Sequence, residues 1–171
     1  MQDENELLWR LYQDHVIHGR HHETLRATTT TLILAVAAGV LGLLGARHDW
    51  PPHNEDLPLT LFLILIGVFG ALFTAKYHER FVFHTNRARA YRDVLDKNLP
   101  NVGINKLRPI ADAKTQNEHP WLYKRRLYRF WIGLHLIIAV LGCLLTLSIL
   151  QHWHAQGQVP IKVTEPAGST Q

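Results

Sequence analysis

The chain has 171 residues, of which 47% are hydrophobic and 19% are charged, and its formal net charge is +4. This length allows one domain. The hydrophobic residues are unevenly distributed, because residues 28–46, 57–75 and 130–150 contain no Asp, Glu, Lys or Arg. A helix needs about 20 apolar residues to cross a bilayer core. The composition therefore predicts an integral membrane protein and excludes the soluble classes.

Residues 1–27 are predicted to form a cytoplasmic amphipathic helix that is continuous with the first span, residues 28–46. No proline occurs from Asn5 to Ala46. Apolar residues and histidines recur there at steps of three and four, the spacing of one helix face. They are Leu8, Leu11, His15, His18, His22 and Leu25. Two adjacent prolines, Pro51 and Pro52, are expected to end the helix within an external loop over residues 47–56.

The second span, residues 57–75, is predicted to begin with Pro58 in its first turn. Its helix is expected to continue to Leu99, because the next proline is Pro100. The first two helices would then form a long antiparallel hairpin that extends into the cytoplasm.

The rest of the chain is predicted to contain one more span. Residues 76–129 form a basic cytoplasmic helical segment, in which residues 100–120 are a connector with one short helix. A third long helix is expected from Trp121 to Trp153, with its span at residues 130–150. Residues 151–171 are expected to form a disordered external tail. The predicted fold class is an all-α membrane protein with three transmembrane helices.

The distribution of cations predicts the orientation. Residues 1–27 and 76–129 together hold sixteen of the eighteen Lys and Arg residues, and basic segments stay in the cytoplasm. The N-terminus is therefore expected inside and the C-terminus outside the inner membrane of a bacterium. Trp50 and Trp153 are expected at the outer ends of the first and third spans.

The basic segments are expected to contact anionic lipid headgroups or a cytoplasmic protein partner. The arginines expected to make these contacts are Arg87, Arg89, Arg92, Arg125, Arg126 and Arg129. No aromatic-interleaved binding motif accompanies this charge, so nucleic acid is not an expected partner.

Twelve histidines are many for this length. A first set lies on the predicted N-terminal helix and a second set follows the second span, so the two sets are expected to meet in the hairpin. The residues are His15, His18, His22, His78, Glu79 and His84. Three interpretations stay open: a plain helix interface, a pH sensor, and a metal or haem site. No HExxH, paired Glu-x-x-His or CxxC motif is present, so no cofactor is expected.

Two polar features lie within the predicted spans. Thr28, Thr29, Thr30 and Thr31 form a hydroxyl band at the start of the first span, and His135 lies in the third. Threonine can bond to carbonyls of its own helix, and a neutral histidine can bond to a neighbouring helix. In a ring of protomers, the same residues could line the inner mouth of a pore.

Small residues recur at four-residue spacing in the spans, which lets helix backbones approach closely. Gly39, Gly42, Gly67 and Ala71 belong to this pattern. They are expected to pack either within one protomer or between protomers of a homo-oligomer.

The architecture resembles two groups of small bacterial membrane proteins. In the RipA-like octameric family, a short amphipathic helix like residues 6–25 precedes a Thr- and Gly-rich first span like residues 28–45. A second span then runs into a basic helix like residues 77–99. The SLATT-type transmembrane effectors also oligomerise and breach the membrane, although their two-span pattern lacks the third span. No catalytic residue carries over from either resemblance.

The sequence therefore favours a non-catalytic function and carries no enzyme motif. The first hypothesis is a homo-oligomeric pore, membrane-perturbing effector or signalling element that is gated through its cytoplasmic helices. The second is an anchor or scaffold that recruits a cytoplasmic partner through residues 76–129. The third is a metal- or haem-binding membrane protein.

Overall fold

The structure is a computed structural model that describes residues 2–46 and 52–157. Its elements are α1 (Gln2–Ala46), the 3-10 turn η1 (Asn54–Asp56), α2 (Leu57–Asn98), α3 (Ile104–Glu118), α4 (Pro120–Lys124) and α5 (Leu127–Gly157). The described residues contain no strand, and α1, α2 and α5 are each long and apolar enough to cross a membrane. The prediction of an all-helical chain with three such helices is confirmed.

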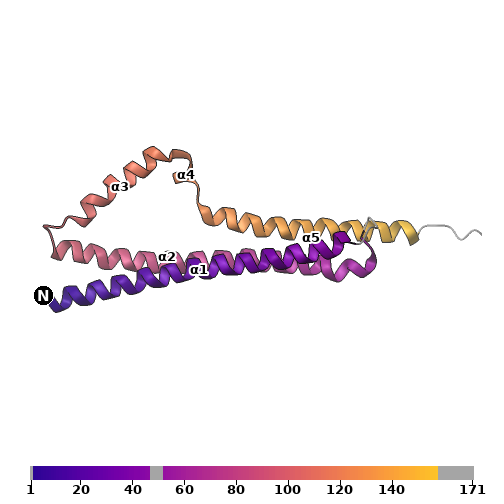
Figure 1. The fold of residues 1–171 in the computed structure, drawn as a ribbon, viewed down its shortest axis with the longest axis horizontal. Helices are drawn as coiled ribbons and strands as arrows, with labels where there is room; N and C mark the ends of the chain where they lie inside the picture. The colour runs from indigo at the N-terminus through magenta and orange to yellow at the C-terminus, as the bar shows by residue number, and fades with distance from the viewer. Residues whose placement is uncertain (1, 47–51, 158–171) are drawn as a thin grey trace, which may run out of the picture.

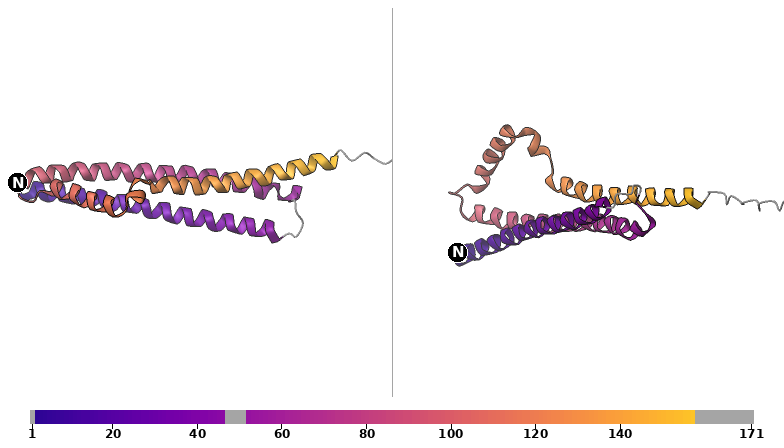
Figure 2. Two further views of the ribbon diagram at one scale, coloured as in Figure 1. Left: turned by 90° about the horizontal axis from the view of Figure 1, so that it is seen from above. Right: turned by 45° about the vertical axis from the view of Figure 1, so that its right-hand side comes forward.

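The three long helices all run roughly along the long direction of the molecule (Figures 1 and 2). α2 packs against both α1 and α5, while α3 and α4 stand away from the other helices in Figure 1. The buried core joins Ile33, Ala37 and Val40 of α1 to Leu63 of α2 and Ile138 of α5. These residues all belong to the apolar stretches, so the core lies where the spans are predicted. We call the polar remainders of the first two helices, residues 3–27 and 76–98, the stalk.

The helix ends follow from proline and glycine. Pro58 stands in the first turn of α2, where the missing N–H would have no partner within the helix. α2 ends at Asn98, two residues before Pro100. Gly103 precedes α3 with a φ of 62°, a left-handed conformation that glycine adopts without steric cost. The short helix predicted in the connector is therefore α3.

Two predicted boundaries differ in the structure. The helix predicted from Trp121 is interrupted, because α4 ends at Lys124 and α5 begins at Leu127. In a continuous helix Arg125 and Arg129 would be neighbours one turn apart, and like charges at that spacing are destabilising. Residues 151–157 were expected in the tail but are helical, since no proline or glycine precedes Gly157 in this part of α5. The predicted loop at 47–51 and the tail at 158–171 lie outside the described residues.

Candidate functional site

The stalk brings four histidines together at one contact between α1 and α2. His15, His18 and His22 come from α1, and His84 comes from α2. The ring centroid of His84 lies 5.2 Å from that of His15, 5.3 Å from that of His18 and 5.4 Å from that of His22. Steps of three and four place the three α1 residues on one helix face. We call these four residues the histidine interface.

The shortest contact in the histidine interface joins two Nδ1 atoms. Those of His15 and His84 lie 3.0 Å apart, so one ring donates a hydrogen and the accepting ring is neutral. The ring of Tyr91 stacks on His15, with centroids 5.6 Å apart. Sequence reasoning missed Tyr91, although seven residues after His84 is a spacing that keeps both on one face of α2.

Charge is disfavoured at two members of the histidine interface, His22 and His84. Burial is the largest cause that lowers the pKa of His84, followed by the neighbouring His15, His22, His18 and Arg87. Burial also lowers the pKa of His22 most, followed by His21, Arg80 and His18. The Nδ1 of His22 is buried with no hydrogen-bond partner among the described residues. Asp14 lies 3.4 Å from the Nε2 of His18, at the exposed edge of the interface.

We expect acidification to loosen the stalk. Consider the pH range between the lowered pKa values of His22 and His84 and the ordinary histidine value of 6.5. In this range the separated helices bind more protons than the packed helices. The contact is therefore most stable at a pH above the ordinary pKa. Its stability falls as the pH falls through this range, and this contribution is lost at a pH below the lowered pKa values.

Spin labels can measure this loosening. Asn5 and Asn98 are joined by a 2.8 Å hydrogen bond at the far end of the stalk, and labels can be attached there after Asn5→Cys and Asn98→Cys in a Cys143→Ser background. The distance between the labels should lengthen and spread between about pH 8 and about pH 5. His84→Leu should reduce that response. An identical distance distribution at both pH values in the labelled protein that keeps His84 would contradict the expectation.

His78 and Glu79 do not join the histidine interface. The ring of His78 stacks on Tyr128 of α5, with centroids 3.9 Å apart. Burial is the main cause that lowers the pKa of His78, against the raising effect of Glu23. Glu79 forms an ion pair with Lys76 of its own helix. The predicted set therefore divides into four clustered histidines and two residues with other partners.

The described parts of the chain hold no group of three or more His, Cys, Asp or Glu side chains placed to bind a metal ion. The rings of His15, His18 and His22 each contact the ring of His84. The expectation that no cofactor is bound stays a prediction, and the metal and haem alternatives gain no support from the geometry.

The threonine band of the first span does not act as a unit. Thr30 is buried and its hydroxyl lies 3.2 Å from the Nε2 of His135. Thr31 donates to the carbonyl of Ala27 in its own helix and, like Thr28, is exposed, while Thr29 is partly buried. Only Thr30 therefore reaches the fully buried His135, where α1 meets α5.

Two further polar contacts were missed by sequence reasoning. Thr60 of α2 and Thr146 of α5 are hydrogen-bonded at 2.9 Å within the apolar part of the bundle. Arg26 is only 7% exposed, lies 2.6 Å from Glu23 and faces the ring of Trp131. The signal for Arg26 was available, since it stands two residues before the first apolar stretch and three residues after Glu23.

The six predicted contact arginines divide among three places. Arg125, Arg126 and Arg129 line a cavity of about 1080 Å³ with Trp121 and Phe130, near the start of α5. On α2, Arg87 covers the ring of Phe83 at 4.2 Å. The remaining two lie in the stalk and line a second cavity, described below: Arg89 and Arg92.

The small residues also divide. A Cβ atom on Gly67 would lie 2.6 Å from the backbone nitrogen of Ala139, so α2 and α5 are in backbone contact there, and Ala71 is buried one turn further on. At Gly39 and Gly42 of α1, an added Cβ atom would meet no other part of the chain that the structure describes within 4 Å. One pair packs within the chain, and the other pair is uncovered.

Comparison of the chain with protein families, with curated proteins and with solved structures finds no match in any of the three. The resemblance to the RipA-like and SLATT-type groups stays an expectation based on architecture.

Proposed function

We propose that the chain is a non-catalytic, homo-oligomeric protein of the bacterial inner membrane. Its stalk receives an input, and its spans deliver the output as a pore, a membrane perturbation or a signal. The histidine interface is the observation that supports this function best. It lies between α1 and α2, and each of these helices continues without a break from the stalk into an apolar stretch. A change in the stalk contact is therefore also a change at the base of two spans.

The orientation follows from charge. With the basic residues 1–27 and 76–129 inside, the stalk and α3 lie in the cytoplasm, and the antiparallel hairpin projects from the inner face of the membrane. The C-terminus lies outside. The assignment to a bacterial inner membrane also rests on the resemblance to the RipA-like and SLATT-type groups.

Uncovered surfaces support self-association. α3 contains no buried residue, and its apolar side chains Leu107 and Ile110 are 62% and 68% exposed. These residues lie outside the apolar stretches, so we do not expect them to face the hydrocarbon core. Gly39 and Gly42 leave room for a close approach by another helix. A second copy would cover both surfaces in one assembly.

The same α3 surface favours one alternative function. A scaffold that recruits a cytoplasmic partner through residues 76–129 would also leave Leu107 and Ile110 uncovered in an isolated protomer. In this alternative the three helices anchor the chain, and the protein has no central pathway.

The native mass of the chain extracted in a mild detergent distinguishes the two functions. The proposed function predicts a closed ring of several protomers. Replacing both uncovered glycines, with Gly39→Leu and Gly42→Leu, should reduce that mass, because bulky side chains block the close approach. The helical content should stay unchanged, since a Cβ atom at either position would meet no other described part of the chain within 4 Å. A monomer in the unsubstituted protein would contradict the oligomeric function and leave the scaffold.

A further inference from the structure

The second cavity, which Arg89 and Arg92 line, lies in the stalk. It has a volume of about 330 Å³ and lies between α1, α2 and α3, within the range of about 300–1,000 Å³ that is usual for small-molecule sites. No carboxylate among the described residues lines it. Its walls include two aromatic residues and four arginines, which are Tyr12, Phe81, Arg20, Arg89, Arg92 and Arg108. We call it the arginine pocket.

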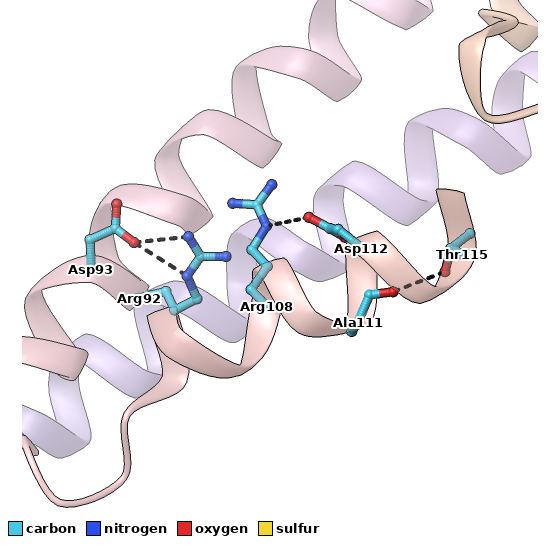
Figure 3. Close-up of polar contacts among 6 residues, drawn as sticks. All are labelled: Arg92, Asp93, Arg108, Ala111, Asp112 and Thr115. Atoms are coloured by element: carbon cyan, nitrogen blue, oxygen red, sulfur yellow. Dashed lines mark hydrogen bonds and ion pairs between the residues drawn. The ribbon is translucent and has the colours of Figure 1, made fainter. Parts of the chain in front are cut away.

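The charges of the arginine pocket are only partly neutralised. Arg92 lies 2.8 Å from Asp93 of the same helix, and Arg108 lies 3.4 Å from Asp112 of its own helix (Figure 3). Arg20 and Arg89 form no ion pair with any residue that the structure describes. Two cations on two different helices therefore lack a counter-charge at the same cavity.

We propose that the arginine pocket binds a small soluble molecule that carries phosphate groups. The planar guanidinium group donates pairs of parallel hydrogen bonds that match phosphate oxygens. Arginines from three helices can therefore contact one phosphorylated ligand from several sides. Tyr12 and Phe81 add apolar ring surface for the organic part of such a ligand. The buried His15 and Ala88 also line the cavity and form part of its floor.

The position of the arginine pocket favours a soluble ligand over a lipid headgroup. Arg20 stands eight residues before the first apolar stretch, or about 12 Å along the helix, and Arg89 stands fourteen residues after the second, or about 21 Å. The headgroup layer extends only about 5–8 Å beyond the hydrocarbon core. The cavity near the start of α5, in contrast, is lined by Phe130, the first residue of the third apolar stretch.

Binding would also fasten the connector to the stalk. α3 contributes Arg108 to the pocket and has few other contacts with α2. A bound anion would therefore hold α3 against the stalk. This ligand site does not depend on the oligomeric function proposed above, because all its named residues belong to one protomer.

Calorimetric titration of the full chain in neutral detergent tests the proposal, with inorganic pyrophosphate and ADP as probes at one fixed salt concentration. We expect saturable binding of at least one probe at one site per chain. The double variant Arg20→Gln and Arg89→Gln should bind about tenfold more weakly or worse, because it loses two charge-assisted contacts. Both side chains are exposed, so the fold should survive, and circular dichroism checks this.

The matched control removes the same charge elsewhere. Arg125→Gln with Arg126→Gln should leave probe binding unchanged and should instead weaken binding of phosphatidylglycerol added to the neutral micelles. No binding of either probe would overturn the proposal. Equal weakening in both double variants would overturn it too, because the effect would then come from net charge. Loss of phosphatidylglycerol binding alone in the Arg20 and Arg89 variant would assign the pocket to lipid instead.

Discussion

Replacing Gly67 by valine is expected to separate α2 from α5 and to lower the free energy of unfolding by about 1–3 kcal/mol. A Cβ atom at this position would lie 2.6 Å from the backbone nitrogen of Ala139 and 2.8 Å from the carbonyl oxygen of His135. Both atoms belong to the backbone of α5, so no side-chain rotation can relieve the overlap. The two helices must move apart, and their packing contacts weaken along the whole interface.

A matched control isolates this effect. Gly133→Val makes the same chemical change in α5, at a glycine where an added Cβ atom would meet no other described part of the chain within 4 Å, and it carries the same change in helix propensity. Unfolding of both variants can be followed by helical circular dichroism as a denaturing detergent is added. Equal losses of stability in the two variants would show that α2 and α5 are not in backbone contact at Gly67.

The second large effect is expected at His135, which is fully buried. Its Nε2 lies 3.2 Å from the Thr30 hydroxyl. Its ring packs directly against Gly70 of α2, where an added Cβ atom would overlap the ring. His135→Ala removes the ring and leaves a cavity between three helices. The cost should be about 2–5 kcal/mol, as for other large-to-small changes in a core.

His135→Leu separates packing from hydrogen bonding. The leucine refills most of the volume but cannot bond to Thr30, so its loss of stability should be smaller than that of the alanine variant. The same detergent titration measures both. If His135→Ala left stability unchanged but altered ion flux through reconstituted vesicles, His135 would line a pathway instead of packing the protomer.

The three apolar helices could be predicted from the sequence because absence of charge over about 20 residues is a local property. The meeting of His15, His18 and His22 with His84 followed from helix rise and spacing. His78 was wrongly grouped with His84 among the clustered residues. Six residues turn a helix by about 240°, so the two side chains leave α2 on different sides, and His78 contacts Tyr128 of α5 instead.

The rotation of each span about its own axis was not predictable from the sequence. Gly39 and Gly67 occur in the same kind of small-residue pattern, yet one is uncovered and the other contacts a backbone. Apolar residues occur on every side of these stretches, so the few buried polar residues, such as Thr60 and His135, do not by themselves set the rotation of each helix. Arg108 could not be assigned to the arginine pocket either, because its position depends on how the connector after Gly103 returns to the stalk.

The continuity of α1 has a mechanical consequence. Over its 45 residues, about 67 Å at 1.5 Å per residue, the helix contains no proline that would act as a joint. A rod of this kind transmits sliding and rotation from one end to the other with little loss. A small displacement near Asn5 therefore reaches Val40 as rigid-body motion, and no relay of rearranging side chains is needed between them.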